Sequence, residues 1–185
     1  MTRFKHLPHY NLDIGSGAMV EQRVGEPTAL EAALGCAVWR FADLEDEVDN
    51  GIAFLAGAGQ RESAILLSEL SFRSKVPVLA ALVREAAATR RFNVGDADPN
   101  EFFHELVVVC LKAEELRNGL VHSRWEWPGS PSPRHLTRVK TTVRPKRGLH
   151  TSTEVLTADH IMDMGDFFVC VAHDLSEFFI DPSTP

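Results

Sequence analysis

The residues best suited to chemistry lie together at positions 117–122, where the chain reads Arg-Asn-Gly-Leu-Val-His. Arg117 offers a fixed positive charge and a fork of donors that matches a phosphate, and His122 carries an imidazole that exchanges protons near neutral pH. Such a pair could cleave RNA without a metal. The imidazole would assist attack by the ribose 2′-hydroxyl or protonate the leaving oxygen, while the guanidinium stabilises charge on the phosphorus centre. Because one histidine makes only one of these proton transfers at a time, a twin subunit would supply the other.

The spacing by itself is weak evidence, since an arginine and a histidine are similarly spaced at 3–9 and 144–150. The context of positions 117–122 is what distinguishes them. They fall near the end of a predicted helix that begins after Asp98, a good N-cap, and runs to about Ser123. Its apolar stripe comprises Phe102, Phe103, Leu106, Val109, Cys110, Ala113, Leu116 and Leu120.

Within that helix Arg117 and His122 should point to different sides, because five residues turn through about 140°. Asn118 and His122 are four residues apart and should share one face. Trp125 and Trp127 follow directly, and we expect them to close the end of the helical domain rather than to stack on a base. Arg117, Asn118 and His122 are therefore the candidate catalytic residues.

Three further helices are predicted from apolar residues spaced three and four apart. The first follows a capping box of Thr28 and Glu31. The second spans about 62–91, with a kink or break expected just before Pro77. The last helix follows Thr157 as its cap.

Residues 136–156 are predicted to form a basic β-hairpin, with alternating residue types on each strand and Gly148 in the turn. The stretch 128–153 carries a charge of +6, whereas the remainder of the chain carries −13. Such a patch suits contacts with an RNA backbone, and the alternative is a solvated hairpin whose charges keep its edges soluble. The candidate RNA-binding residues are Arg138, Lys140, Arg144, Lys146 and Arg147.

These elements predict an all-α fold, an antiparallel four-helix bundle with the basic β-hairpin inserted before the last helix. We expect residues 1–26 to be an N-terminal arm and residues 27–181 to be a single domain. At 185 residues the chain is long enough for one domain with a substantial core and short for two.

Glu45 falls on the apolar stripe of the first predicted helix, where a carboxylate is costly unless it has a partner. It could orient Arg117 or His122 across the bundle. The alternative is a boundary residue that reaches solvent or pairs with a structural arginine such as Arg73.

Composition points to a cytoplasmic protein, with 44% hydrophobic and 24% charged residues, no apolar run long enough for a membrane span and no signal-peptide core. The three separated cysteines are expected to be reduced core residues. We expect neither a metal nor a cofactor, because the chain has no cysteine pairs, no HExxH motif and no phosphate-binding glycine loop.

The segment 114–125, which reads EELRNGLVHSRW, resembles the HEPN superfamily of small helical nucleases and nucleotide-binding domains. The signature of that superfamily is an arginine, usually followed by a polar residue, and a histidine after four to six intervening positions. The resemblance covers roughly 28–127 and the last helix, and the motif is its specific part. It implies that Arg117 and His122 are the active pair, that Asn118 is their polar companion, and that a homodimer brings two motifs together.

HEPN domains commonly act as metal-independent endoribonucleases in toxin, defence or RNA-processing systems. The resemblance therefore implies that RNA is the substrate and that an antitoxin or another neutralising protein is a partner. Many HEPN domains have lost catalysis, so the alternative is a non-catalytic module that binds a nucleotide or a partner.

Overall fold

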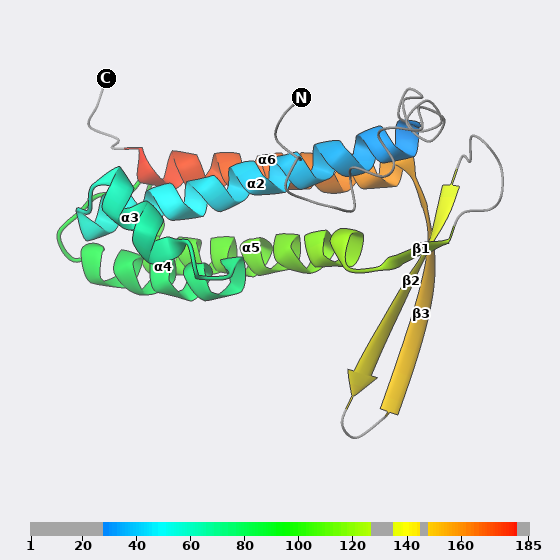
Figure 1. Ribbon diagram of the computed structural model, residues 1–185. Coiled ribbons are helices and arrows are strands. Elements are labelled where there is room, and N and C mark those ends of the chain that lie inside the picture. Colours follow the sequence, from blue (N-terminus) through cyan, green and yellow to red (C-terminus); the bar gives the residue numbers. More distant parts are fainter. Residues whose placement is uncertain (1–27, 127–134, 145–147, 181–185) are drawn as a thin grey trace, which may run out of the picture.

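The structure is a computed structural model that describes residues 28–126, 135–144 and 148–180 (Figure 1). The predicted arm at 1–26 lies outside these residues. The described part of the chain forms five helices and one three-stranded antiparallel sheet. In chain order the elements are α2 (Ala29–Ala56), α3 (Gln60–Leu67), α4 (Phe72–Ala86), α5 (Pro99–Val121), β1 (Arg124–Glu126), β2 (His135–Arg144), β3 (Gly148–Thr157) and α6 (Ala158–Phe179).

The long helices lie in two layers, α2 beside α6 and α4 beside α5 (Figure 1). Apolar side chains fill the space between the layers. The ring of Phe41 on α2 has its centroid 4.9 Å from that of Phe72 on α4 and 5.4 Å from that of Phe168 on α6. All three rings are buried, so this cluster joins three helices in one core.

Local capping chemistry fixes the helix starts where the sequence predicts them. Thr28 and Glu31 form a complete capping box at the start of α2, and Thr157 caps α6 by accepting a hydrogen bond from the backbone of residue 160. Asp98 caps α5 by accepting from the backbone N–H groups of residues 100 and 101. At the other end of α2, Gly57 has a left-handed backbone with φ of 63°, a conformation that glycine adopts without steric cost.

The predicted four-helix bundle is wrong, because the described residues form five helices and a sheet of three strands. The single helix predicted over 62–91 is two helices, α3 and α4. The break lies at 68–71, where the Ser71 side chain accepts from the Ser74 N–H and starts α4. Pro77, the expected breaking point, sits inside α4 without ending it, because proline removes only one backbone donor.

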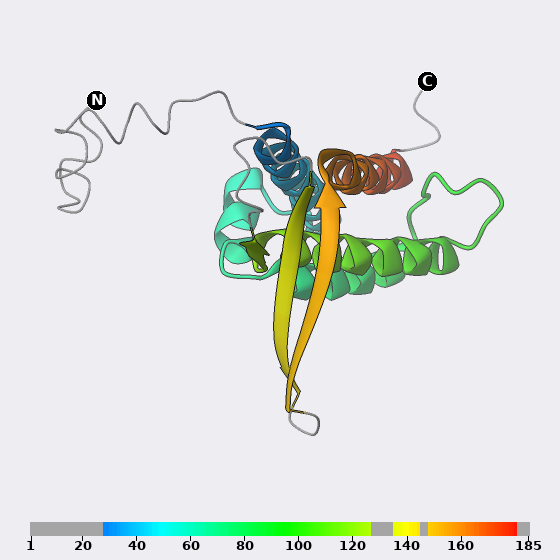
Figure 2. The ribbon, with the colours of Figure 1, turned by 90° about the vertical axis from the view of Figure 1, so that its right-hand side faces the viewer.

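The predicted hairpin is present as β2 and β3, and Gly148 has the expected left-handed backbone with φ of 71°. The third strand was not predicted. β1 follows α5 closely and pairs antiparallel with the first part of β2. Leu136 and Leu156 are buried against the helices, whereas the far part of the hairpin projects away from both layers (Figure 2).

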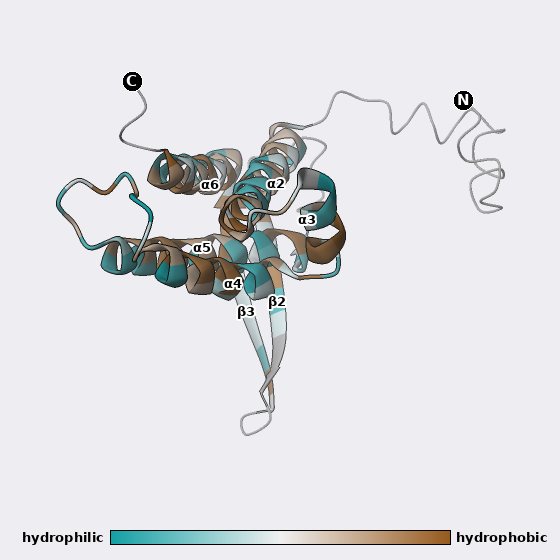
Figure 3. Cartoon of the chain, turned by 90° about the vertical axis from the view of Figure 1, so that its left-hand side faces the viewer, coloured by the Kyte–Doolittle hydropathy of each residue, from teal (hydrophilic) through white to brown (hydrophobic). Residues whose placement is uncertain are grey.

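Along its length α3 changes from hydrophilic residues at its start to hydrophobic residues at its end (Figure 3). Two of its apolar side chains, Ile65 and Leu66, are exposed. Across the ranges that the structure describes, no helix combines the length and the apolar character needed to cross a membrane.

Candidate functional site

The candidate catalytic residues occupy the last two turns of α5. The helix buries Phe103, Leu106, Cys110 and Leu120 along one face, which fixes its rotation against the rest of the core. His122 is its C-cap, and the His122 backbone N–H donates to the Asn118 carbonyl at 3.0 Å.

Arg117 points inward from α5 toward α2. Its Cζ atom lies 5.5 Å from the centroid of the buried Phe41 ring, which is within range of a cation–π contact. Its Nη1 donates to Asn118 Oδ1 at 3.1 Å, and its Nε is buried without a hydrogen-bond partner among the described residues. The guanidinium is therefore held in place by Asn118 and Phe41.

His122 is exposed to solvent at the C-terminal end of α5. Its imidazole makes no hydrogen bond or ion pair with the residues that the structure describes. Arg117 points inward and His122 is exposed, so the two side chains lie on different sides of the helix end, as the rotation of about 140° between them predicts. Asn118 is half-buried and contacts Arg117 directly, so it links the two faces of the motif.

Arg138, a candidate RNA-binding residue, instead lies against the motif helix. A Cβ atom at Gly119 would come within 2.5 Å of Arg138 Nη1, so the guanidinium occupies the space that this glycine leaves. Its Nη2 forms an ion pair with Glu154, and the Arg138 side chain is only 15% exposed. Arg138 therefore couples the hairpin to α5 and has little surface for RNA.

The other basic residues of the hairpin differ in what the structure describes. Lys140 is half-buried and lies close enough to α5 to influence Glu115. The pKa of the Glu115 carboxyl is lowered, mainly by the hydrogen bond and charge of Lys112 and to a smaller extent by Lys140. The side chains of Arg144, Lys146 and Arg147 lie outside the described residues.

Glu45 does not contact Arg117 or His122. Its Oε1 accepts from Lys75 Nζ at 2.9 Å, and Asp49 Oδ2 accepts from the same ammonium at 2.8 Å. Arg73, the alternative partner, pairs with Glu114 at 3.7 Å. Glu45 is thus part of a structural ion-pair network centred on a lysine that the sequence analysis did not single out.

Trp125 closes the end of α5 as expected. Its Nε1 donates to the Leu120 carbonyl at 3.0 Å, which satisfies one of the last backbone acceptors of the helix. The ring also lines an apolar cavity of about 160 Å³ together with Leu34, Leu136 and Ile161. Trp127 lies outside the described residues.

No protein-family model, curated protein or solved structure matches this chain. The HEPN resemblance consequently rests on the sequence of residues 114–125. The site therefore contains the exposed imidazole of His122 and the guanidinium of Arg117, which donates to the Asn118 side chain. The basic hairpin packs against the same end of α5.

Proposed function

We propose that this protein is a metal-independent endoribonuclease of HEPN type that acts in the cytoplasm. In this proposal His122 transfers the proton and Arg117 binds the reacting phosphate. The observation that carries it is the exposed imidazole of His122, which has no partner among the described residues, at the same end of α5 as the Arg117 guanidinium.

The reaction would be attack of a ribose 2′-oxygen on the adjacent phosphorus. A bond forms between these two atoms, the bond from phosphorus to the 5′-oxygen breaks, and the products are a 2′,3′-cyclic phosphate and a 5′-hydroxyl. His122 removes the proton from the 2′-hydroxyl or delivers one to the leaving oxygen. Arg117 lowers the barrier by donating to the phosphoryl oxygens as their charge grows.

A homodimer would supply the second imidazole. Val121, which precedes His122, is 42% exposed, so the end of the motif helix presents an apolar side chain to solvent. Burial of such side chains favours self-association. We expect Val121→Asp to produce a monomer without nuclease activity, while Val108→Asp, at an exposed valine earlier on α5, keeps both the dimer and the activity. Analytical ultracentrifugation and a cleavage assay on the same samples test this.

The hairpin would bind the RNA backbone through Lys140, Arg144, Lys146 and Arg147, since Arg138 is occupied by Glu154. Replacing Arg144, Lys146 and Arg147 with serine should lower RNA affinity. The slope of log affinity against log salt should become shallower by about 2, because each lost phosphate contact on a single strand is worth about 0.7. Fluorescence anisotropy at several salt concentrations measures both quantities.

The decisive experiment incubates the protein with mixed RNA in excess chelator and examines the ends of the products. We expect 2′,3′-cyclic phosphate ends with the wild type and a loss of at least about 100-fold in rate with His122→Ala. Arg117→Ala should lose a similar factor. Arg61→Ala and His173→Ala are matched controls, because both residues are exposed and lie on other helices. Equal cleavage by all variants, or cleavage abolished by the chelator, contradicts the proposal.

A non-catalytic module that binds a nucleotide or a neutralising protein is the second candidate. The contacts of Arg117 with Asn118 and Phe41 favour it, because they hold the guanidinium in the geometry of a fixed anion receptor. In that case the wild type binds nucleotide or RNA without cleaving it, and Arg117→Ala loses binding while His122→Ala retains it.

A further inference from the structure

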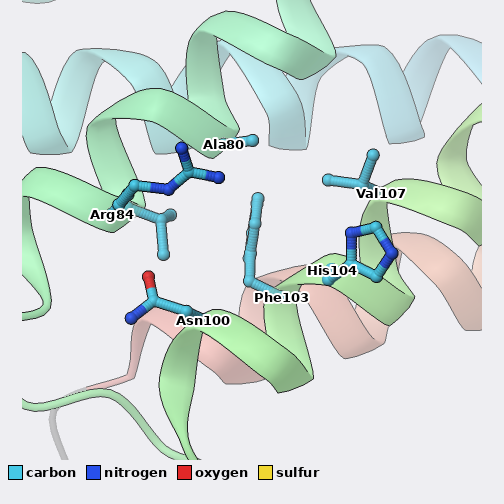
Figure 4. A pocket seen from close by; sticks show the side chains of 7 residues that line it. Ala80, Arg84, Asn100, Phe103, His104 and Val107 are labelled. Carbon is cyan, nitrogen blue, oxygen red and sulfur yellow. The ribbon is translucent and has the colours of Figure 1, made fainter.

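A small cavity lies between the end of α4 and the start of α5, remote from the motif (Figure 4). Its volume is about 90 Å³. The apolar part of its lining is Ala80, Val83, Phe103 and Val107. The polar part is Arg84 from α4 together with Asn100 and His104 from α5.

The three polar residues line one cavity for a structural reason. Asn100 and His104 are four residues apart on α5 and therefore share one face of that helix. Arg84 is in the last turn of α4, four residues after Ala80 on the same face. Figure 4 shows the guanidinium of Arg84 extending from α4 toward Phe103, with Asn100 on the same side of that ring and His104 on its other side beside Val107.

All three residues are exposed, and none of their side chains has a partner among the described residues. Arg40, Arg73 and Arg138 each form an ion pair with a carboxylate, whereas Arg84 forms none. The side chains of Asn100 and His104 likewise make no hydrogen bond within the described ranges. No carboxylate lines the cavity, so its only formal charge is the positive one of Arg84.

We infer that this cavity is a binding site for a single phosphate-type oxyanion. The guanidinium presents paired donors that match two oxygens of such a group, and the Asn100 amide and the His104 ring add further N–H donors. Phe103 is buried and forms an apolar wall of the cavity. The volume is far below the roughly 300 Å³ at which whole small-molecule sites begin, so the site suits one anionic group rather than a complete nucleotide.

This site is separate from the one proposed for cleavage. His104 and Arg117 are thirteen residues apart on one helix, which corresponds to about 20 Å along its axis. The inference therefore goes beyond the proposed nuclease function and does not depend on it. The anion could be free phosphate, the phosphate of a mononucleotide or the terminal phosphate of an RNA chain.

Two-dimensional NMR of the full chain, labelled with ¹⁵N and titrated at constant ionic strength, tests the inference. The separate arms are inorganic phosphate, adenosine monophosphate, a short oligonucleotide with a 5′-phosphate and the same oligonucleotide with a 5′-hydroxyl. We expect saturable shifts in the amides of residues 80–84 and 100–107 with at least one phosphate species. The arm that binds most tightly identifies the source of the anion, and shifts confined to 117–122 would overturn the inference.

Variants show whether the binding is specific to the cavity. Arg84→Ala should weaken it at least about tenfold, the loss that corresponds to one charge-assisted hydrogen bond. Asn100→Ala and His104→Ala should each weaken it a few-fold. Arg61→Ala removes the same charge from an exposed position on α3 and should retain wild-type affinity. Equal weakening by Arg84→Ala and Arg61→Ala, or the absence of saturable shifts in every arm, would overturn the inference, and circular dichroism checks that each variant is folded.

Discussion

Lys75 places an ammonium group inside the protein, with only 6% of its side chain exposed, between the carboxylates of Glu45 and Asp49. Burial acts to lower the pKa of Lys75, but the hydrogen bonds and charges of Asp49 and Glu45 outweigh it, so the pKa is raised. Burial raises the pKa of the Asp49 carboxyl, and the hydrogen bond from Lys75 offsets this only in part. The network is therefore stable only while all three groups are present.

Lys75→Met should lower the free energy of unfolding at pH 7 by about 2 kcal/mol. A fully buried pair that loses one partner costs roughly 3–5 kcal/mol, and the value here is smaller because about a third of each carboxylate faces water. Urea unfolding measures it. Lys112→Met is the control, because the pair of Lys112 with Glu115 is exposed and should contribute less than about 0.5 kcal/mol.

The deficit of Lys75→Met should shrink as the pH falls. A carboxyl whose folded pKa is raised binds its proton at a higher pH in the folded state than in the unfolded state. Acidification through the folded pKa of Asp49, toward its ordinary value of 3.8, therefore relieves the buried negative charge. A deficit that grows on acidification would contradict this assignment.

Burial raises the pKa of the Cys110 thiol to about 12, from an ordinary value of 9.0. Because the thiolate is the reactive form, a disulfide reagent at pH 8 should modify exposed Cys170 and half-buried Cys36 in the native protein but leave Cys110 unmodified. Denaturation should release the third thiol. Spectrophotometric counting of thiols before and after denaturation tests this, and three rapidly reacting thiols in the native state would show that the core around Cys110 opens readily.

At the scale of elements, the features that depend on neighbouring residues were predictable. The caps at Thr28, Asp98 and Thr157 and the left-handed glycines at 57 and 148 each follow from a few consecutive side chains. A cap acts through hydrogen bonds within one turn, so its signal is complete in the local sequence.

The features that depend on distant residues were not predicted. Lys75 is buried because α2 provides two carboxylates from 26 and 30 residues away, and β1 is a strand only because β2 pairs with it. The pairing of Arg138 with Glu154, by contrast, could have been predicted from the sequence. Glu154 is the only acidic residue between 135 and 157, and the register that pairs Arg144 with Gly148 places it directly opposite Arg138.

Gly119→Ala tests how tightly that pair joins the hairpin to α5. Alanine favours a helix by about 1 kcal/mol over glycine, but its Cβ would displace Arg138 from the position in which it meets Glu154. We expect Gly119→Ala to be nearly neutral in the wild type and stabilising by about 0.5–1 kcal/mol in an Arg138→Ala background. Chemical unfolding of the four proteins of this double-mutant cycle gives the coupling, and an identical effect in both backgrounds would exclude it.

For the molecule as a whole, the hairpin and the helices contribute differently to stability. Leu136 and Leu156 at the base of the sheet belong to the core, while Leu149, near the far end of β3, is exposed. Since apolar burial is the main stabilising contribution in folding, the far part of β2 and β3 adds charge and reach rather than stability. The helical layers should therefore tolerate a shorter hairpin.

Deleting residues 140–143 and 149–152 shortens each strand by four residues and keeps the pair of Arg144 with Gly148. Because an even number is removed from each strand, every remaining side chain stays on its own face of the sheet. We expect the helical circular dichroism to be retained and the free energy of unfolding to change by less than about 1 kcal/mol.

The same deletion should weaken RNA binding, if the hairpin positions RNA for His122 as proposed. Arg144 moves about 13 Å toward the helices, at 3.3 Å per strand residue, so its distance from the motif no longer matches the RNA that the two contact in the proposal. A matched variant that replaces the eight residues with serine and threonine keeps the length and loses only Lys140 among the cations. Greater loss of RNA affinity in the deletion than in this variant assigns the effect to reach, whereas equal affinities would show that the hairpin contributes charge alone.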